Sequence, residues 1–197
     1  MNPDTKLESI KSKLQEFYNY ILNTNNLDNI YNITKLELKE YIRNTLKLVN
    51  NKCYEVIILR KRREEIRNDI KDLERAFIGS EWHEPSEEGK NTGGRKEDTN
   101  ILRKIKIREL KDKLEDLTNQ TLLIEASLEH NKQMVAAALD FILNNENAKI
   151  MKLYYIDCYS TQDIAIENYY TTDAVKKMRK RAVNKITNTI IDLFQNQ

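Results

Sequence analysis

The stretch that decides the fold near the C-terminus runs from residue 153 to residue 186 and reads LYYIDCYSTQDIAIENYYTTDAVKKMRKRAVNKI. Ser160 has Asp163 three residues later, a pattern typical of a helix N-cap, and Thr171 offers a second cap. Behind the two caps, apolar residues recur at helical spacing and are expected to face inward. They are Ile164, Ala165, Val175, Met178, Ala182 and Ile186. Together with a preceding helix over 146–156, the pattern predicts three helices, the second over 160–167 and the third from 171 onward.

The last of these helices is strongly basic. It carries six cations within ten residues, and Asp173 is the one acid nearby. Because the inward positions are apolar, the cations are expected to project outward. A short helix, a turn and a longer basic helix form the arrangement of a helix-turn-helix, and such a face suits the phosphate-lined major groove of DNA. The plainer interpretation is a solvated face on a small structural domain.

The expected site residues follow from their places on this helix. Its N-terminal end offers free backbone N–H groups beside threonine hydroxyls, which suit a phosphate. Contacts to base edges or within the groove are expected from Thr172, Asp173, Lys176, Lys177 and Lys180. Phosphate contacts are expected from Thr171, Arg179, Arg181 and Lys185, with a structural ion pair as the alternative for Arg181.

Two long helices are predicted upstream, joined by a polar loop. The first starts at a capping box made by Thr34 and Glu37 and continues to residue 78. Its apolar seam is Ile42, Leu46, Val49, Cys53, Val56, Leu59, Ile66, Ile70, Leu73 and Phe77. Residues 79–98 hold all four glycines and are expected to be a flexible loop.

The second long helix is expected to start at a cap on Asp98 or Thr99. Its seam alternates steps of three and four, the rule of a coiled coil. The seam residues are Ile107, Leu110, Leu114, Leu117, Thr121, Ile124, Leu128, Asn131, Val135, Ala138 and Ile142. An antiparallel coiled-coil hairpin is the simplest arrangement. The polar Thr121 and Asn131 leave pairing with a second chain, and hence a homodimer, open.

Three segments are therefore expected. Residues 1–33 hold an N-terminal helix over 5–22 and an Asn-rich linker, residues 34–143 the hairpin, and residues 144–197 the helix-turn-helix. Charged residues make up 32% of the chain and Gly and Pro number only 4 and 2, which favours an all-α fold of long solvated helices.

The chain shows no signal for several other classes of protein. It has no run of 18 apolar residues and no apolar N-terminal segment, so neither a membrane span nor a signal peptide is expected. Cys53 and Cys158 are not in metal-ligand spacing, and His83 beside acidic residues offers a single imidazole. No catalytic motif is present. We expect a cytoplasmic protein of a bacterial host cell that is not an enzyme and needs no cofactor or metal.

The stretch 153–186 resembles region 4 of bacterial sigma factors, and more so the sigma-region-4-like C-terminus of small phage transcription regulators of the ArpU type. This stretch aligns with the family pattern without a gap. The residues that match the pattern are Leu153, Tyr155, Ile156, Ser160, Ile164, Ala165, Thr171, Val175, Met178, Arg181 and Ala182. The resemblance implies double-stranded DNA as partner, with RNA polymerase as a further one. No stretch resembles sigma region 2, so a complete sigma factor is not expected.

This chain departs from the family pattern at the turns. Cys158 and Tyr169 stand where the pattern has Gly, Asn168 stands at an apolar position, and Ala174 replaces a Thr. Because Asn tolerates a left-handed backbone, the turn is expected to shift by one residue, to Asn168.

The sequence thus predicts a DNA-binding transcription regulator encoded by a phage or prophage. Two rivals remain: a small subunit of a phage DNA-packaging machine, and a structural coiled-coil protein that binds RNA polymerase without touching DNA.

Overall fold

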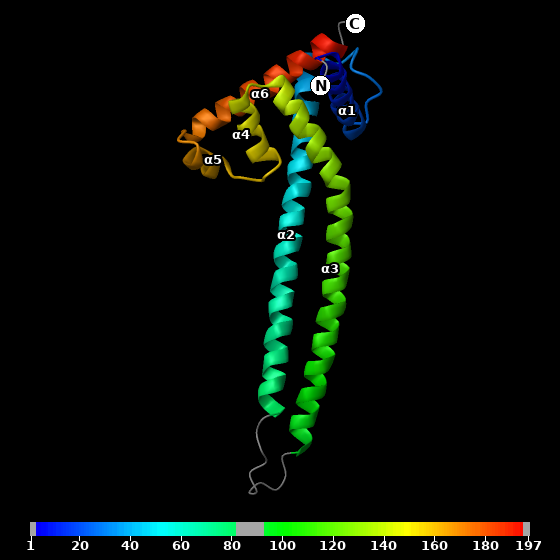
Figure 1. The fold of residues 1–197 in the computed structure, drawn as a ribbon, viewed down its shortest axis with the longest axis vertical. Helices are drawn as coiled ribbons and strands as arrows, with labels where there is room; N and C mark the ends of the chain where they lie inside the picture. The colour runs from blue at the N-terminus through cyan, green and yellow to red at the C-terminus, as the bar shows by residue number, and fades with distance from the viewer. Residues whose placement is uncertain (1–2, 82–92, 195–197) are drawn as a thin grey trace. The chain divides into compact units, whose positions relative to one another are not determined.

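The computed structural model describes residues 3–81 and 93–194, with side chains over 12–76 and 100–194 (Figure 1). These residues form helices and contain no strand, which confirms the predicted all-α class. The helices are α1 (Pro3–Thr24), α2 (Lys35–Glu81), α3 (Gly93–Ile142), α4 (Asn145–Tyr155), α5 (Thr161–Glu167) and α6 (Thr172–Phe194). Within the described ranges, no helix combines the length and the apolar character needed to cross a membrane.

The start of α2 agrees with the predicted capping box. The Thr34 backbone N–H donates to Glu37 Oε2 at 2.8 Å, and the Glu37 N–H donates to Thr34 Oγ1 at 3.3 Å. Two N–H groups that a helix start leaves unpaired are satisfied in this way. The hydrogen bonds from the Thr34 hydroxyl and backbone also lower the pKa of Glu37.

The interval between the long helices is narrower than the predicted loop over 79–98. α2 continues to Glu81 and α3 already begins at Gly93. The predicted cap at Asp98 or Thr99 is therefore wrong, because both residues lie within α3. The charged run Arg95, Lys96 and Glu97 consists of good helix formers, which outweigh the two glycines before it. The histidine considered as a metal ligand, His83, lies outside the described residues.

The chain divides into two compact units. The terminal unit comprises residues 1–55 and 126–197, and the central unit comprises residues 56–125. This division differs from the expected segments 1–33, 34–143 and 144–197. Within the terminal unit, side-chain hydrogen bonds tie the first half of α2 to the end of α1 and to α4. Asn25 Nδ2, just after α1, donates to Thr45 Oγ1 at 3.1 Å, and Asn50 Nδ2 donates to the Tyr154 carbonyl of α4 at 2.8 Å.

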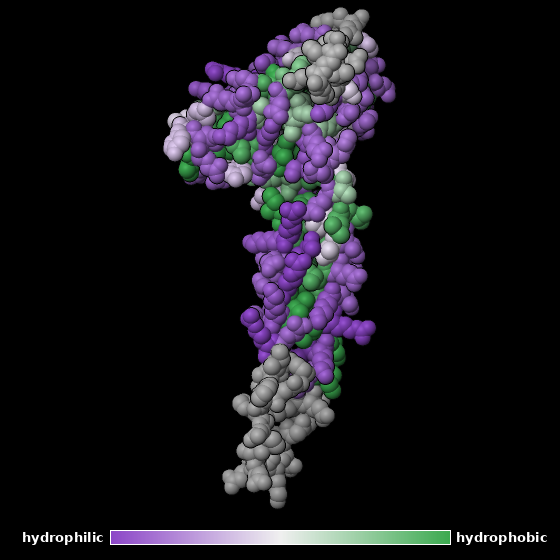
Figure 2. All heavy atoms as spheres, in the orientation of Figure 1, coloured by the Kyte–Doolittle hydropathy of each residue, from purple (hydrophilic) through white to green (hydrophobic). Residues whose placement is uncertain are grey.

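In the central unit, α2 and α3 pack side by side along their predicted seams. Ile66, Ile70 and Leu117 form its buried core, and Leu59, Ile107, Leu110 and Leu114 flank it. Figure 2 shows apolar side chains along the line where the two helices meet, with hydrophilic ones on either side.

Charged contacts across this pair of helices show their direction. Arg60 pairs with Glu125 at 2.6 Å, and Glu74 pairs with Lys111 at 2.9 Å. Because later residues of α2 meet earlier residues of α3, the two helices run antiparallel. Arg63 lies on the seam between Leu59 and Ile66, and its Nε is buried without a hydrogen-bond partner.

The two polar residues of the α3 seam are satisfied within their own helix. Thr121 is buried and its hydroxyl donates to the Leu117 carbonyl at 2.6 Å. Asn131 Nδ2 donates to the Ser127 carbonyl at 3.1 Å. Neither residue therefore needs a second chain to complete its hydrogen bonding.

The terminal unit has a continuous apolar core. The predicted α2 seam from residue 42 to residue 53 is buried throughout. On α3 the buried face widens beyond the predicted seam to Met134 and Leu139, as expected where a helix meets more than one neighbour, and Leu143 just after the helix is buried as well. At the far end of α6, the rings of Phe194 and Tyr18 of α1 stack at 4.3 Å.

A small polar junction joins α2 to the loop after α4. Besides its bond to Tyr154, Asn50 Nδ2 lies 3.5 Å from Cys158 Sγ, and that thiol donates to the Asn50 carbonyl at 3.5 Å. Cys53 is buried on the same helix, as predicted for a small core residue. Burial, and then the neighbouring Cys53, raise the pKa of the Cys158 thiol to about 11.

Replacing Asn50 tests this junction. Asn50→Ala leaves the Tyr154 carbonyl without its donor, so we expect the free energy of unfolding to fall by about 1–2 kcal/mol. The measurement is urea unfolding followed by circular dichroism. The matched control is Asn51→Ala, because the neighbouring Asn51 is exposed. Equal losses in the two variants would show that Asn50 does not hold α2 to the loop after α4.

Candidate nucleic-acid interface

Three helices at the C-terminal end of the terminal unit pack around one core. Ile150 of α4, Ile164 and Ala165 of α5, and Val175 of α6 are buried together. Leu153, Tyr154, Tyr170 and Met178 pack against them. α4, α5 and α6 all contact one another (Figure 1). The predicted inward positions are thus inward, and residues 160–186 form two helices rather than one continuous helix.

The caps of α5 and α6 are those expected from the sequence. The Asp163 N–H donates to Ser160 Oγ at 3.1 Å, and the Ser160 N–H donates to Asp163 Oδ2 at 3.3 Å, which completes a capping box. The Ala174 N–H donates to Thr171 Oγ1 at 3.1 Å. These bonds fix where α6 starts, and therefore which side chains lie on its first turn.

The predicted shift of the α5–α6 turn to Asn168 is wrong. Tyr169 itself takes the left-handed conformation, with φ 58°, whereas Asn168 has φ −109°. Two backbone bonds close the turn: the Tyr170 N–H donates to the Ala165 carbonyl at 2.9 Å and the Tyr169 N–H to the Ile166 carbonyl at 3.4 Å. This is the Schellman pattern, which needs one left-handed residue after the helix. Cys158, the other residue at a family Gly position, also has positive φ, at 60°.

Eight of the nine expected site residues are exposed on α6 or its cap. They are Thr171, Thr172, Asp173, Lys176, Lys177, Lys180, Arg181 and Lys185. One ion pair lies among them, between Lys176 and Asp173 at 3.4 Å, and its side chains are mostly exposed. In the part of the chain that the structure describes, Arg181 makes no ion pair, so the structural pair considered for it is absent.

Arg179 was expected to face outward and contact a phosphate, but its side chain packs against α4 and α5 instead. It is half-buried, and its guanidinium carbon lies 3.1 Å from the centre of the Tyr154 ring and 5.4 Å from that of Tyr155. Arg179 Nη1 donates to Thr161 Oγ1 at 3.3 Å, and its Nε is buried without a partner. A guanidinium stacked on an aromatic face stabilises that contact by ~0.5–2 kcal/mol. Arg179 therefore joins α4, α5 and α6 to one another.

Sequence reasoning missed a group of cations on α2. The pKa of Lys39 is lowered, first by partial burial and then by the positive charges of Arg43, Lys180 and Lys35. Lys35, Lys39 and Arg43 recur at a spacing of four and so share one helix face. That spacing is visible in the sequence, but nothing local connects it to Lys180 on α6.

Mutation can separate the packing role of Arg179 from the exposed position of Arg181 on the same helix. We expect Arg179→Ala to lower the free energy of unfolding by about 1–2 kcal/mol, because it removes the stack on Tyr154 and the bond to Thr161. Arg181→Ala removes the same side chain from an exposed position of the same helix, so we expect a change within about 0.5 kcal/mol. Urea unfolding of both variants provides the measurement. Similar values would mean that Arg179 does not hold the three helices together.

The turn residue Tyr169 offers a second stability test. Its side chain is 96% exposed, so little packing is lost on truncation, whereas its left-handed backbone is costly for any residue with a Cβ. Tyr169→Gly should therefore raise the free energy of unfolding by about 0.5–1 kcal/mol. Tyr31→Gly is the control, because Tyr31 is 61% exposed but has no positive φ. A loss of stability in Tyr169→Gly would contradict the inferred strain.

The site is thus a rigid helix end with exposed cations and hydroxyls on one side and a shared apolar core on the other. Such an arrangement offers several hydrogen-bond donors to a polyanion. Comparison with protein-family models, with curated proteins and with solved structures finds no match to this chain.

Proposed function

We propose that this protein is a DNA-binding transcription regulator, encoded by a phage or prophage, and that α5 and α6 act as its helix-turn-helix. The observation that carries the proposal is the division of α6 into two sides. Val175, Ala182 and Ile186 are buried against the rest of the terminal unit, while Lys176, Lys177 and Lys180 remain exposed. Such a helix has one face held by the protein and the other available to a duplex.

The dimensions of DNA agree with this role. The major groove is ~12 Å wide and ~8.5 Å deep, so it admits an α-helix end over about six residues. On α6 that length covers Thr172, Asp173, Lys176 and Lys177, which together with Lys180 one turn later are proposed to contact base edges or the groove. Thr171, Arg181 and Lys185 would contact phosphates on either side. Arg179 takes no part in contact with DNA and serves to position the helix.

The conformation of the turns supports the resemblance to sigma-region-4-like regulators. Cys158 and Tyr169 replace glycines of that pattern, yet both have a left-handed backbone, with φ 60° and 58°. The chain thus keeps the backbone shape for which glycine is the usual residue. The two departures at glycine positions of the pattern are therefore compatible with the proposed resemblance.

The central unit has a separate role in this proposal. Its antiparallel helices would form an intramolecular coiled-coil hairpin, a rigid element that holds a second partner such as RNA polymerase or a second copy of the chain. The ion pairs of Arg60 with Glu125 and of Glu74 with Lys111 join the two helices of one chain and support this arrangement. The proposed setting is the cytoplasm of the bacterial host.

Charge reversal on the first turns of α6 tests the proposal. A duplex first selected by the protein from a random library is titrated by fluorescence anisotropy at several salt concentrations. We expect Lys176→Glu with Lys177→Glu to weaken binding and to make the dependence of log affinity on log salt shallower by about 1 for each lysine. The matched control is Lys47→Glu with Lys113→Glu, which reverses two exposed cations on α2 and α3.

Two results would count against the proposal. Unchanged affinity of the α6 variant at moderate salt would show that α6 is not the reading helix. Failure of the parent protein to bind any duplex at low salt would favour a structural coiled-coil protein instead. Assembly into large rings, seen by light scattering, would favour a DNA-packaging subunit.

A further inference from the structure

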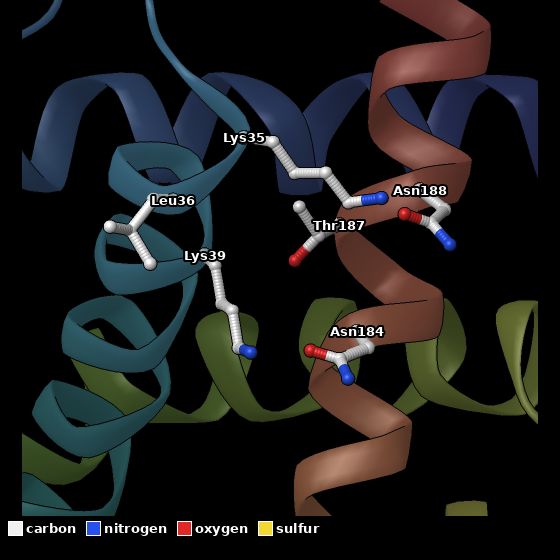
Figure 3. Close-up of a pocket in the computed structure, with 6 residues that line it drawn as sticks. All are labelled: Lys35, Leu36, Lys39, Asn184, Thr187 and Asn188. Carbon is white, nitrogen blue, oxygen red and sulfur yellow. The ribbon is translucent and has the colours of Figure 1, made fainter.

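A second basic surface lies between the start of α2 and the second half of α6. An open groove of about 470 Å³ there is lined by Lys35, Leu36, Lys39, Asn184, Thr187 and Asn188 (Figure 3). All six residues belong to the terminal unit. Figure 3 shows the ammonium groups of Lys35 and Lys39 directed toward α6, with the carboxamides of Asn184 and Asn188 on the opposite wall.

The chemistry of the lining suits an anion. It combines two ammonium groups with two amide side chains that donate hydrogen bonds, and none of the six residues is acidic. In the described ranges, neither Lys35 nor Lys39 has an acidic partner within ion-pair distance. No carboxylate among the described side chains pairs with their charge.

The positive field in this groove comes from both helices. Arg43 and Lys35 of α2 and Lys180 of α6 all lower the pKa of Lys39, after the effect of its partial burial. Like charges held close together repel, and an anion bound among them relieves that repulsion. The groove therefore favours a ligand that brings negative charge to both walls.

The groove continues the face of α6 that is proposed to read DNA. Lys177, Lys180, Asn184 and Asn188 recur at spacings of three and four, so they share one side of the helix. Asn184 lies seven residues beyond Lys177, which is ~10 Å along the helix axis. With the first six residues of α6 spanning a major groove only ~8.5 Å deep, Asn184 and Asn188 lie beyond its rim, on the side of the helix that continues toward the flanking phosphates.

We propose that this groove binds the phosphodiester backbone of DNA beside the segment that α6 reads. The inference rests on the proposed function, because it takes the duplex as the ligand. Lysine and asparagine side chains are both common phosphate contacts in DNA complexes. The groove would make α2 a second DNA-contacting element and lengthen the site along the duplex. An acidic protein segment fits the charge as well, but only the duplex explains the continuity with Lys177 and Lys180.

Two duplexes and two groove variants test this inference. Both duplexes carry the selected sequence; the short one covers the α6 contacts alone, and the long one extends by about one helical turn, or about 10 base pairs, on each side. We expect the parent protein to bind the long duplex more tightly. Lys35→Gln with Lys39→Gln should lose that gain, with a salt dependence shallower by about 2 on the long duplex and unchanged on the short one. The variant Asn184→Asp with Asn188→Asp places negative charge on the other wall, so it should also lose the tighter binding to the long duplex.

Controls keep this inference separable from the proposed function. Lys13→Gln with Lys113→Gln removes two exposed cations outside the groove and should bind both duplexes like the parent. Lys176→Glu with Lys177→Glu should weaken binding to both duplexes. If the groove variants keep the full gain from the long duplex while the α6 variant loses affinity for both, the groove does not bind DNA and the role of α6 stands. If the parent binds neither duplex, both proposals fail.

Discussion

The packing of α6 against α4 and α5 is the constraint on which the rest of the site depends. Val175, buried with Ile150 and Ile164, fixes the rotation of α6 about its axis. Because a helix has only one angular position that buries this side, the exposed positions are fixed at the same time. The outward direction of Lys176, Lys177 and Lys180 is thus a consequence of apolar burial, and no ion pair is needed to hold these side chains in place.

Local signals in the sequence were sufficient for most of this region. Ser160 and Thr171 cap their helices as predicted, because capping involves residues only three apart. The inward positions follow from helical periodicity. Arg179 was expected among the exposed cations, because periodicity alone does not reveal a partner on another helix. It lies four residues after Val175, at the edge of the buried face, and its aromatic partner Tyr154 comes from a helix 25 residues earlier.

Features that depend on tertiary contact were not accessible from the sequence. The groove needs Lys39 and Asn184 to lie opposite each other, although 145 positions separate them in the chain. The turn at Tyr169 illustrates a different limit. Propensity favours Asn over Tyr for a left-handed backbone, but the Schellman bonds to Ala165 and Ile166 decide which residue takes that conformation. The predicted boundaries of the loop over 79–98 were wrong, because charged helix formers outweighed two glycines in a segment that looked polar and irregular.

The way the α5–α6 turn is closed has a consequence for how this protein can change during evolution. Main-chain groups make both closing bonds, and the Tyr169 side chain points almost wholly into solvent. Substitutions there alter the outer surface next to the reading helix while the angle between the two helices stays the same. Every residue with a Cβ bears a similar backbone cost there, so exchanging one unbranched side chain for another adds little to it. Related chains can therefore change the side chain exposed at this turn, and the partners that it contacts, without changing the packing of α5 against α6.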